Sequence, residues 1–193
     1  MTYTGQVVVG GRGDVRRLDE VEVRKLAVGP LANDVYLLTC RRTGAQVLID
    51  AADAPDDVLA LVREGSSAAR LDVVVTTHRH LDHLRALASI VAVTGAATAV
   101  GAPDADAVAA AADVHEPEAV AGRVHLFTGD SLFPGGVGSA QHDPDRFDQL
   151  LTDVTERVFD RFDDETWVYP GHGADTTIGA ERPHLDEWRE RGW

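Results

Sequence analysis

Apolar residues along this chain follow two kinds of pattern. Short apolar or alternating runs have the period of β-strands, and stretches with helical period separate the later runs. The predicted strands are residues 6–9, 21–28, 35–40, 46–50, 73–77, 97–101, 124–128 and 167–169. A strand-rich first part followed by alternating strands and helices predicts an α/β fold in which sheet packs against helices.

The clearest helix is expected over residues 144–160. Asp143 is a suitable N-cap, Pro144 fits the first turn, and apolar residues recur at helical spacing from Phe147 onward. Similar signals indicate three further helices. The four predicted helices are residues 55–64, 82–94, 144–160 and 181–190.

Composition and charge limit the possible partners. The 193 residues are 44% hydrophobic and 26% charged, as in an ordinary folded protein. The 32 acidic and 18 basic residues give a net charge of −14, which argues against nucleic acid as a partner. We find no membrane-spanning run and no signal peptide, so a cytoplasmic protein without a membrane partner is expected. Cys40 is expected to be a buried, inert thiol in a strand.

Potential metal ligands are concentrated after the predicted strand at 73–77. The next residues, 78–83, read HRHLDH, so four donors lie within six positions. Imidazole nitrogens and carboxylate oxygens are suitable ligands for zinc and for iron. A compact turn at a strand end can direct several such groups to one point. These candidate ligands are His78, His80, Asp82 and His83.

Two later strands end in the same way. The strand at 124–128 is followed by Gly129 and Asp130, and the strand at 167–169 leads to Gly171 and His172. Each glycine permits a sharp turn before the polar residue. Because ligand sites of α/β proteins gather at the carboxyl ends of strands, the three segments together predict one shared metal site.

These segments resemble the motifs of a known family. HRHLDH at 78–83 resembles the HxHxDH signature of the metallo-β-lactamase fold. FTGDSLF at 127–133 and YPGHG at 169–173 resemble two further motifs of that superfamily. VLIDA at 47–51 resembles the early strand that ends in aspartate. The resemblance extends over roughly residues 30–190 in the family's order, and the most similar branch is the glyoxalase II-like hydrolases of bacteria.

The resemblance implies a single αββα sandwich domain over residues 1–193 with a dinuclear metal site. The expected cofactor is Zn²⁺, one or two ions per chain, with iron or manganese as alternatives. Asp50 would be a carboxylate that steadies the ligands. By motif position, His78 and His80 would hold the first metal, Asp82, His83 and His172 the second, and Asp130 would bridge both.

The implied activity is metal-dependent hydrolysis of a small molecule. A metal-bound hydroxide, oriented by Asp82 as the catalytic residue, would attack the carbonyl carbon of a thioester, ester or lactone. The loop Pro134–Gly138 either borders the pocket or is a flexible turn without ligand contact. It lacks the Lys-Ser/Thr of a phosphate-binding loop.

The sequence departs from the family pattern in one respect. The family has a third first-metal histidine in a Gly-His-Thr-like motif between the HxHxDH turn and the Gly-Asp turn, and no such motif occurs here. The interval from His83 to Asp130 is short, with an expected seam near Val114–His115, so one or two strands of the second sheet are predicted to be missing. His115 could replace the absent ligand, although a solvated loop is the favoured interpretation. His125 is interpreted as a sheet residue.

The absent motif keeps two other functions open. One is a catalytically impaired metal-binding relative with an incomplete first site. The other, ranked last, is a mononuclear iron oxygenase, since that chemistry draws on the histidine that is missing. Unpaired sheet edges left by the missing strands also predict a homo-oligomer, a local rearrangement or reduced stability.

Overall fold

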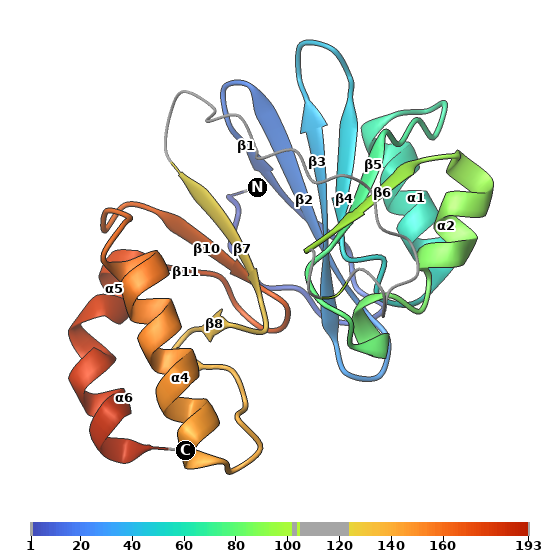
Figure 1. The fold of residues 1–193 in the computed structure, drawn as a ribbon. Helices are drawn as coiled ribbons and strands as arrows, with labels where there is room; N and C mark the ends of the chain where they lie inside the picture. Colours follow the sequence, from blue (N-terminus) through green and yellow to red (C-terminus); the bar gives the residue numbers. More distant parts are fainter. Residues whose placement is uncertain (1, 102–103, 105–123, 193) are drawn as a thin grey trace. The chain divides into compact units, whose positions relative to one another are not determined.

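The computed structural model describes residues 2–101, 104 and 124–192. The chain divides into two compact units, residues 1–116 and 117–193, and each is described by itself. Both contain strands and helices, so the α/β prediction is confirmed (Figure 1). Among the described residues, no helix is long and apolar enough to cross a membrane.

The first unit is built on a six-stranded mixed sheet whose strands follow one another in chain order. The strands from β1 to β4 pair antiparallel with their neighbours, and those from β4 to β6 pair parallel, so β4 belongs to both groups. Parallel neighbours end at the same edge of a sheet. The residues that follow β4 and β5 are therefore brought together. The strands are β1 (Asp14–Arg17), β2 (Val21–Val28), β3 (Asn33–Cys40), β4 (Gln46–Ile49), β5 (Val73–Thr76) and β6 (Ala97–Val100).

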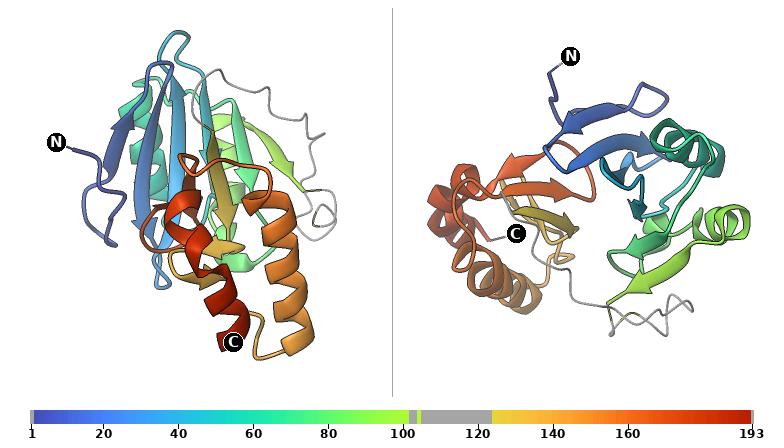
Figure 2. Two further views of the ribbon diagram at one scale, coloured as in Figure 1. Left: turned by 90° about the vertical axis from the view of Figure 1, so that its left-hand side faces the viewer. Right: turned by 90° about the horizontal axis from the view of Figure 1, so that it is seen from above.

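Two helices cover one face of this sheet (Figure 2). Helix α1 (Pro55–Gly65) has Pro55 in its first turn, as expected, and buries one apolar face. Helix α2 (Leu87–Thr94) ends at Gly95, which adopts a left-handed conformation with φ 70°. Together they close a core in which Leu37, Leu48 and Val74 are fully buried. This core fixes the strands that carry the polar residues at the sheet edge.

Two predictions of secondary structure in the first unit were wrong. Residues 6–9 form no strand, because the Asp14 carboxylate accepts hydrogen bonds from the backbone of Thr4 and Gly5 and holds the preceding segment as a loop. The edge strand forms instead at β1. The helix predicted over 82–94 begins only at Leu87, since residues 81–83 are taken up by the 3₁₀ turn η1 (Leu81–His83).

One carboxylate anchors the start of the parallel strands. Asp72 precedes β5 and accepts a hydrogen bond from the backbone N–H of Gln46 at 2.8 Å, and Arg70 Nη2 donates to it at 2.8 Å. These hydrogen bonds, that from Gln46 first, lower the pKa of Asp72 below its ordinary value. Asp72 therefore favours the folded state while it is ionised.

The second unit contains a three-stranded sheet, ordered β11-β10-β7, and a small hairpin. The strand β7 (His125–Gly129) runs parallel to β10 (Trp167–Pro170), which pairs antiparallel with β11 (Thr176–Thr177). The hairpin joins β8 (Leu132–Phe133) to β9 (Gly136–Val137). The sequence analysis predicted β7 and β10. It missed β8, β9 and β11, because strands of two residues are too short to show an alternating pattern.

Helices pack against this sheet to form the core of the second unit. Asp143 caps α4 (Pro144–Val154) by accepting from the N–H groups of Asp145 and Arg146, as the sequence predicts. A π-helical turn, η3 (Thr155–Phe159), continues α4, so the predicted helix over 144–160 is confirmed. The predicted last helix is divided into α5 (Ile178–Glu181), η4 (Arg182–His184) and α6 (Leu185–Arg191).

The remaining expectations concern Cys40 and the shortened interval. Cys40 lies in β3 as predicted but is only half-buried, and hydrogen bonds from Thr43 lower the pKa of its thiol. The expected seam near Val114–His115 lies outside the described residues. The missing strands, the single domain over 1–193 and the oligomeric state therefore remain predictions.

Candidate metal centre

Four of the six predicted ligands lie in a tight turn directly after β5. Backbone hydrogen bonds from His83 N to His80 O (3.0 Å) and from Leu84 N to Leu81 O (3.2 Å) close this turn. The loop after β4 holds the next residues, because the N–H groups of Arg85 and Ala86 donate to Ala52 and Ala51. The apolar strand is thus followed by a turn that does not depend on the donor side chains for its backbone shape.

Asp50 organises the imidazoles of this turn. It follows β4, adopts a left-handed conformation (φ 56°) and is 2% exposed. Its Oδ1 accepts from the backbone N–H of Thr77 at 2.7 Å, and its Oδ2 accepts from Thr77 Oγ1 and His83 Nδ1, each at 2.8 Å. Because a carboxylate only accepts, the network assigns the proton of His83 to Nδ1 and leaves the lone pair on Nε2.

Through Thr77, the same carboxylate also determines which ring nitrogen of His78 carries the hydrogen. The Thr77 hydroxyl donates a hydrogen bond to Asp50. Its oxygen is therefore the acceptor in the 3.0 Å hydrogen bond with His78 Nδ1. The lone pair of His78 is then on Nε2. One buried carboxylate therefore presents the Nε2 atoms of two histidines as potential ligands, which is the usual arrangement around histidine-bound metals.

Two donor pairs occur within this turn. His78 Nε2 lies 2.9 Å from His80 Nδ1, and His83 Nε2 lies 3.6 Å from Asp82 Oδ2. Two ligands bound to one tetrahedral zinc at its usual bond lengths are roughly 3.3 Å apart. Both separations are near that value, so the donor set fits metal ligation, with His78 and His80 as one pair and Asp82 and His83 as the other.

Sequence reasoning missed two residues that support the turn. Thr77 connects Asp50 to His78, as described above. Asn33, 1% exposed at the start of β3, donates from Nδ2 to Asp82 Oδ2 at 2.8 Å. The only signal for Thr77 was its place beside the ligand motif. Nothing local marks Asn33, which lies far from Asp82 in the sequence.

The second unit brings its two predicted ligands together. The parallel strands β7 and β10 end side by side, and Gly171 N donates to Gly129 O at 2.8 Å. As a result, Asp130 Oδ1 lies 3.6 Å from His172 Nε2. The expectation that these strands deliver donors at their carboxyl ends is thus met within this unit.

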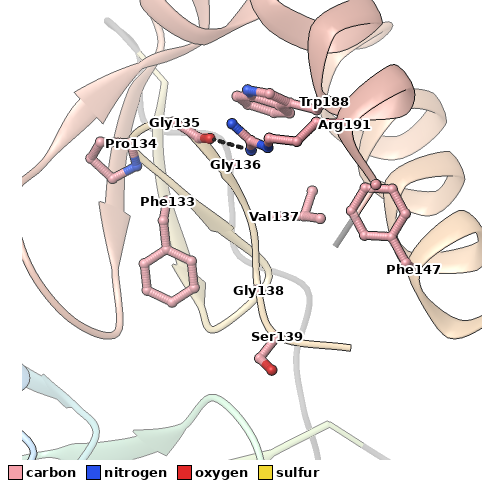
Figure 3. Close-up of a pocket in the computed structure, with 11 residues that line it drawn as sticks. Phe133, Pro134, Gly135, Gly136, Val137, Gly138, Ser139, Phe147, Trp188 and Arg191 are labelled. Atoms are coloured by element: carbon pink, nitrogen blue, oxygen red, sulfur yellow. Dashed lines mark hydrogen bonds between the residues drawn. The ribbon is translucent and has the colours of Figure 1, made fainter. Parts of the chain in front are cut away.

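The glycine-rich loop after Asp130 is a defined hairpin that lines an open pocket of about 560 Å³ in the second unit (Figure 3). Gly135 at its tip donates from N to Glu181 Oε2 at 2.8 Å and accepts at O from Arg191 Nη2 at 3.0 Å. Gly138 passes so close to the backbone of Asp130 that a Cβ atom there would lie 1.8 Å from Asp130 O. The hairpin therefore also fixes the backbone at Asp130.

Two further histidines among the described residues, His125 and His184, have contacts of their own. His125 is a sheet residue of β7, as interpreted from the sequence, and its Nδ1 lies 2.9 Å from the Tyr169 hydroxyl. His184 contacts Glu187 at the start of α6. His115, the candidate replacement for the absent ligand, lies outside the described residues.

The chain is similar to several known proteins. Residues 28–122 match the family model of the metallo-beta-lactamase superfamily. A probable hydroxyacylglutathione hydrolase, glo2, of Schizosaccharomyces pombe is 26% identical over 167 aligned residues, covering 72% of this chain and 63% of the relative. An uncharacterized 11.5 kDa protein of Rhodococcus erythropolis is 31% identical over 122 residues, covering 63% of this chain and 82% of that protein.

A solved structure shares the fold. The crystal structure of TTHA1623 in a di-iron-bound form aligns with a TM-score of 0.61 and 25% identity, over 82% of this chain and 96% of that chain. The chain spans less than two thirds of the S. pombe relative. The alignment with that relative is longer than the part of this chain it covers, so the relative contains residues without a counterpart here.

Proposed function

Because the chain belongs to the metallo-β-lactamase superfamily, a family of metal-dependent hydrolases, we propose that it hydrolyses a small thioester, ester or lactone with the help of bound metal. The observation that carries the proposal is the turn after β5, in which Asp50 orients His83 and, through Thr77, His78. Histidines oriented in this way by a buried carboxylate are typical of metal sites.

The proposed ligands follow from the donor pairs and the family motifs. His78 and His80 would bind one ion, and Asp82 and His83 would bind a second. The order of the motifs supports Asp130 and His172, which would be the remaining ligands. Zinc is the first choice because imidazole and carboxylate donors suit it. Iron and manganese are alternatives, and the relative TTHA1623 is described in a di-iron-bound form.

Asp82 and His83 would have different roles in the reaction. When bound, the metal would supply Lewis acidity, lowering the pKa of water and polarising the substrate carbonyl. Asp82, 18% exposed in its side chain, would orient the attacking water through its carboxylate. His83 is fully buried, so its ring would serve as a ligand and would not exchange protons with the substrate.

The choice of substrate rests on the relatives. The S. pombe relative is named a probable hydroxyacylglutathione hydrolase, and a hydroxyacylglutathione is a thioester. This supports a thioester as the first substrate to test. Esters and lactones present the same carbonyl carbon to an attacking water, so they remain within the proposed class.

The test combines metal content with turnover. We expect one or two ions per chain by elemental analysis, and hydrolysis of at least one thioester, ester or lactone with zinc, iron or manganese supplied. Asp82→Ala should abolish turnover, whereas Asp186→Ala, which removes a carboxylate that is 94% exposed, should not. Metal binding without turnover across the panel would favour the impaired relative. Protein that binds no metal would refute the proposal.

A further inference from the structure

The strongest unassigned feature is the buried amide of Asn33 beside the Asp82 carboxylate. Asn33 is 1% exposed, and its Nδ2 donates to Asp82 Oδ2 at 2.8 Å. We propose that Asn33 is a positioning residue, which holds the Asp82 carboxylate in the orientation that binds metal. This inference rests on the proposed function, since it gives Asp82 a metal to bind.

The place of Asn33 is fixed by the hairpin between β2 and β3. The turn closes with a hydrogen bond from Ala32 N to Gly29 O at 3.2 Å, and Ala32 has a left-handed conformation with φ 52°. A Cβ at Gly29 would lie 2.9 Å from Asp53 Oδ2, so this turn packs directly on the loop after β4. Asn33 then pairs with Val28 in the sheet. The amide therefore projects from a rigid position.

The contact acts on the oxygen that faces the neighbouring ligand. Asp82 Oδ2 accepts from Asn33 and lies 3.6 Å from His83 Nε2. A carboxylate oxygen has two lone-pair directions, so it can accept one N–H and still bind an ion. Asp50 orients His83 from one side, and Asn33 orients Asp82 from the other. The two donors of the second pair are thus each fixed by a residue outside the turn.

The chemistry of an amide suits this task. An arginine or lysine at this position would also donate to Asp82, but its positive charge would oppose a cation at the same carboxylate. A neutral N–H fixes the oxygen and leaves the negative charge of the carboxylate for the metal.

Asn33 is not required for the shape of the turn itself. The backbone hydrogen bonds of His83 and Leu84 close the turn, and those of Arg85 and Ala86 attach it to the loop after β4. Removal of the Asn33 amide should therefore leave the backbone in place and release rotation of the Asp82 carboxylate. The expected effect is on metal affinity rather than on folding.

The experiment compares two buried amides of the first unit. Asn33→Leu keeps a similar volume and removes the donor. Gln46→Leu is the matched control, because Gln46 is fully buried and its Nε2 donates to Val62 O and Arg70 O rather than to a side chain of the ligand turn. Zinc affinity is measured by competition with a chromogenic chelator, and thermal unfolding is measured on the same metal-free samples.

We expect Asn33→Leu to weaken the binding of one zinc ion by about 10–100-fold, as for other residues that orient a ligand. Gln46→Leu should lower the melting temperature at least as much and leave zinc affinity unchanged. If Asn33→Leu does not fold, Asn33→Ala provides the test, since it removes the N–H donor and adds neither bulk nor charge beside Asp82.

Zinc affinity in a folded Asn33 variant equal to that of the wild type or of Gln46→Leu would overturn the positioning role while leaving the proposed function intact. Wild-type protein that binds no zinc, iron or manganese would overturn both. A loss of affinity confined to the Asn33 variants would support the positioning role.

Discussion

Two substitutions of Asp50 distinguish its contribution to stability from its effect on the His83 imidazole. In Asp50→Ala, three hydrogen bonds to the buried carboxylate are lost, from Thr77 N, Thr77 Oγ1 and His83 Nδ1. At about 1 kcal/mol for each bond, the loss is about 3 kcal/mol. Alanine at φ 56° adds about 1–2 kcal/mol, because its Cβ is crowded in the left-handed region. We expect unfolding free energy to fall by about 4–5 kcal/mol.

Asp50→Asn is the informative partner of that variant. Asparagine tolerates the left-handed conformation, and its carbonyl can still accept from Thr77 N, so the expected stability loss is only about 1–2 kcal/mol. Its amide would donate toward His83 Nδ1 and move the imidazole proton to Nε2, the atom proposed to bind metal. We therefore expect zinc affinity to fall about 10–100-fold although the protein stays folded.

The measurements are urea unfolding of the metal-free protein and zinc competition at pH 7. Wild-type zinc affinity in Asp50→Asn would refute the argument that Asp50 sets the protonation of His83. A loss below about 1 kcal/mol in Asp50→Ala would refute the hydrogen-bond and backbone accounting.

Three further predictions concern stability. Lys25 is fully buried, with its Nζ 3.0 Å from Asp34 Oδ2. Lys25→Met would leave the buried Asp34 charge without its cation and should lower the free energy of unfolding by about 3–5 kcal/mol in urea, and the added change Asp34→Leu should recover part of that loss. An unchanged urea midpoint in Lys25→Met would contradict this. Because the pKa of Asp72 is lowered on folding, its ionised carboxylate stabilises the fold at pH values above its ordinary pKa of 3.8. That stabilisation is lost as the pH falls through the folded-state pKa. Asp72→Asn should therefore be less stable than wild type at pH 7 and show a smaller decline on acidification, whereas parallel pH profiles would refute the assignment. Gly138→Ala should shift the backbone at Asp130 and reduce both the melting temperature and the zinc affinity, measured by thermal unfolding and chelator competition. Wild-type values for both would show that the loop accommodates the added Cβ, and would refute the prediction.

Features encoded by neighbouring residues could be predicted from the sequence. The apolar strand before His78, the Asp143 cap of α4 and the glycine before Asp130 each act within a few residues of their effect. The ligand motif belongs to this class, because its donors share one turn. The sequence therefore predicted the fold class. It also predicted donors after these strands, and in the second unit Asp130 and His172 follow parallel neighbours and lie 3.6 Å apart.

Long-range contacts decided the rest. Residues 6–9 have a strand pattern, yet hydrogen bonds to Asp14 and a bond from the buried Lys25 Nζ to Gly5 O keep the segment before them irregular. The protonation of His83 depends on Asp50, and the orientation of Asp82 depends on Asn33, residues that reach the turn only after the sheet has formed. Residue types and local periodicity determined which donors this protein carries. Only tertiary structure determined which atom of each donor is presented, because the partners that fix those atoms come from other strands.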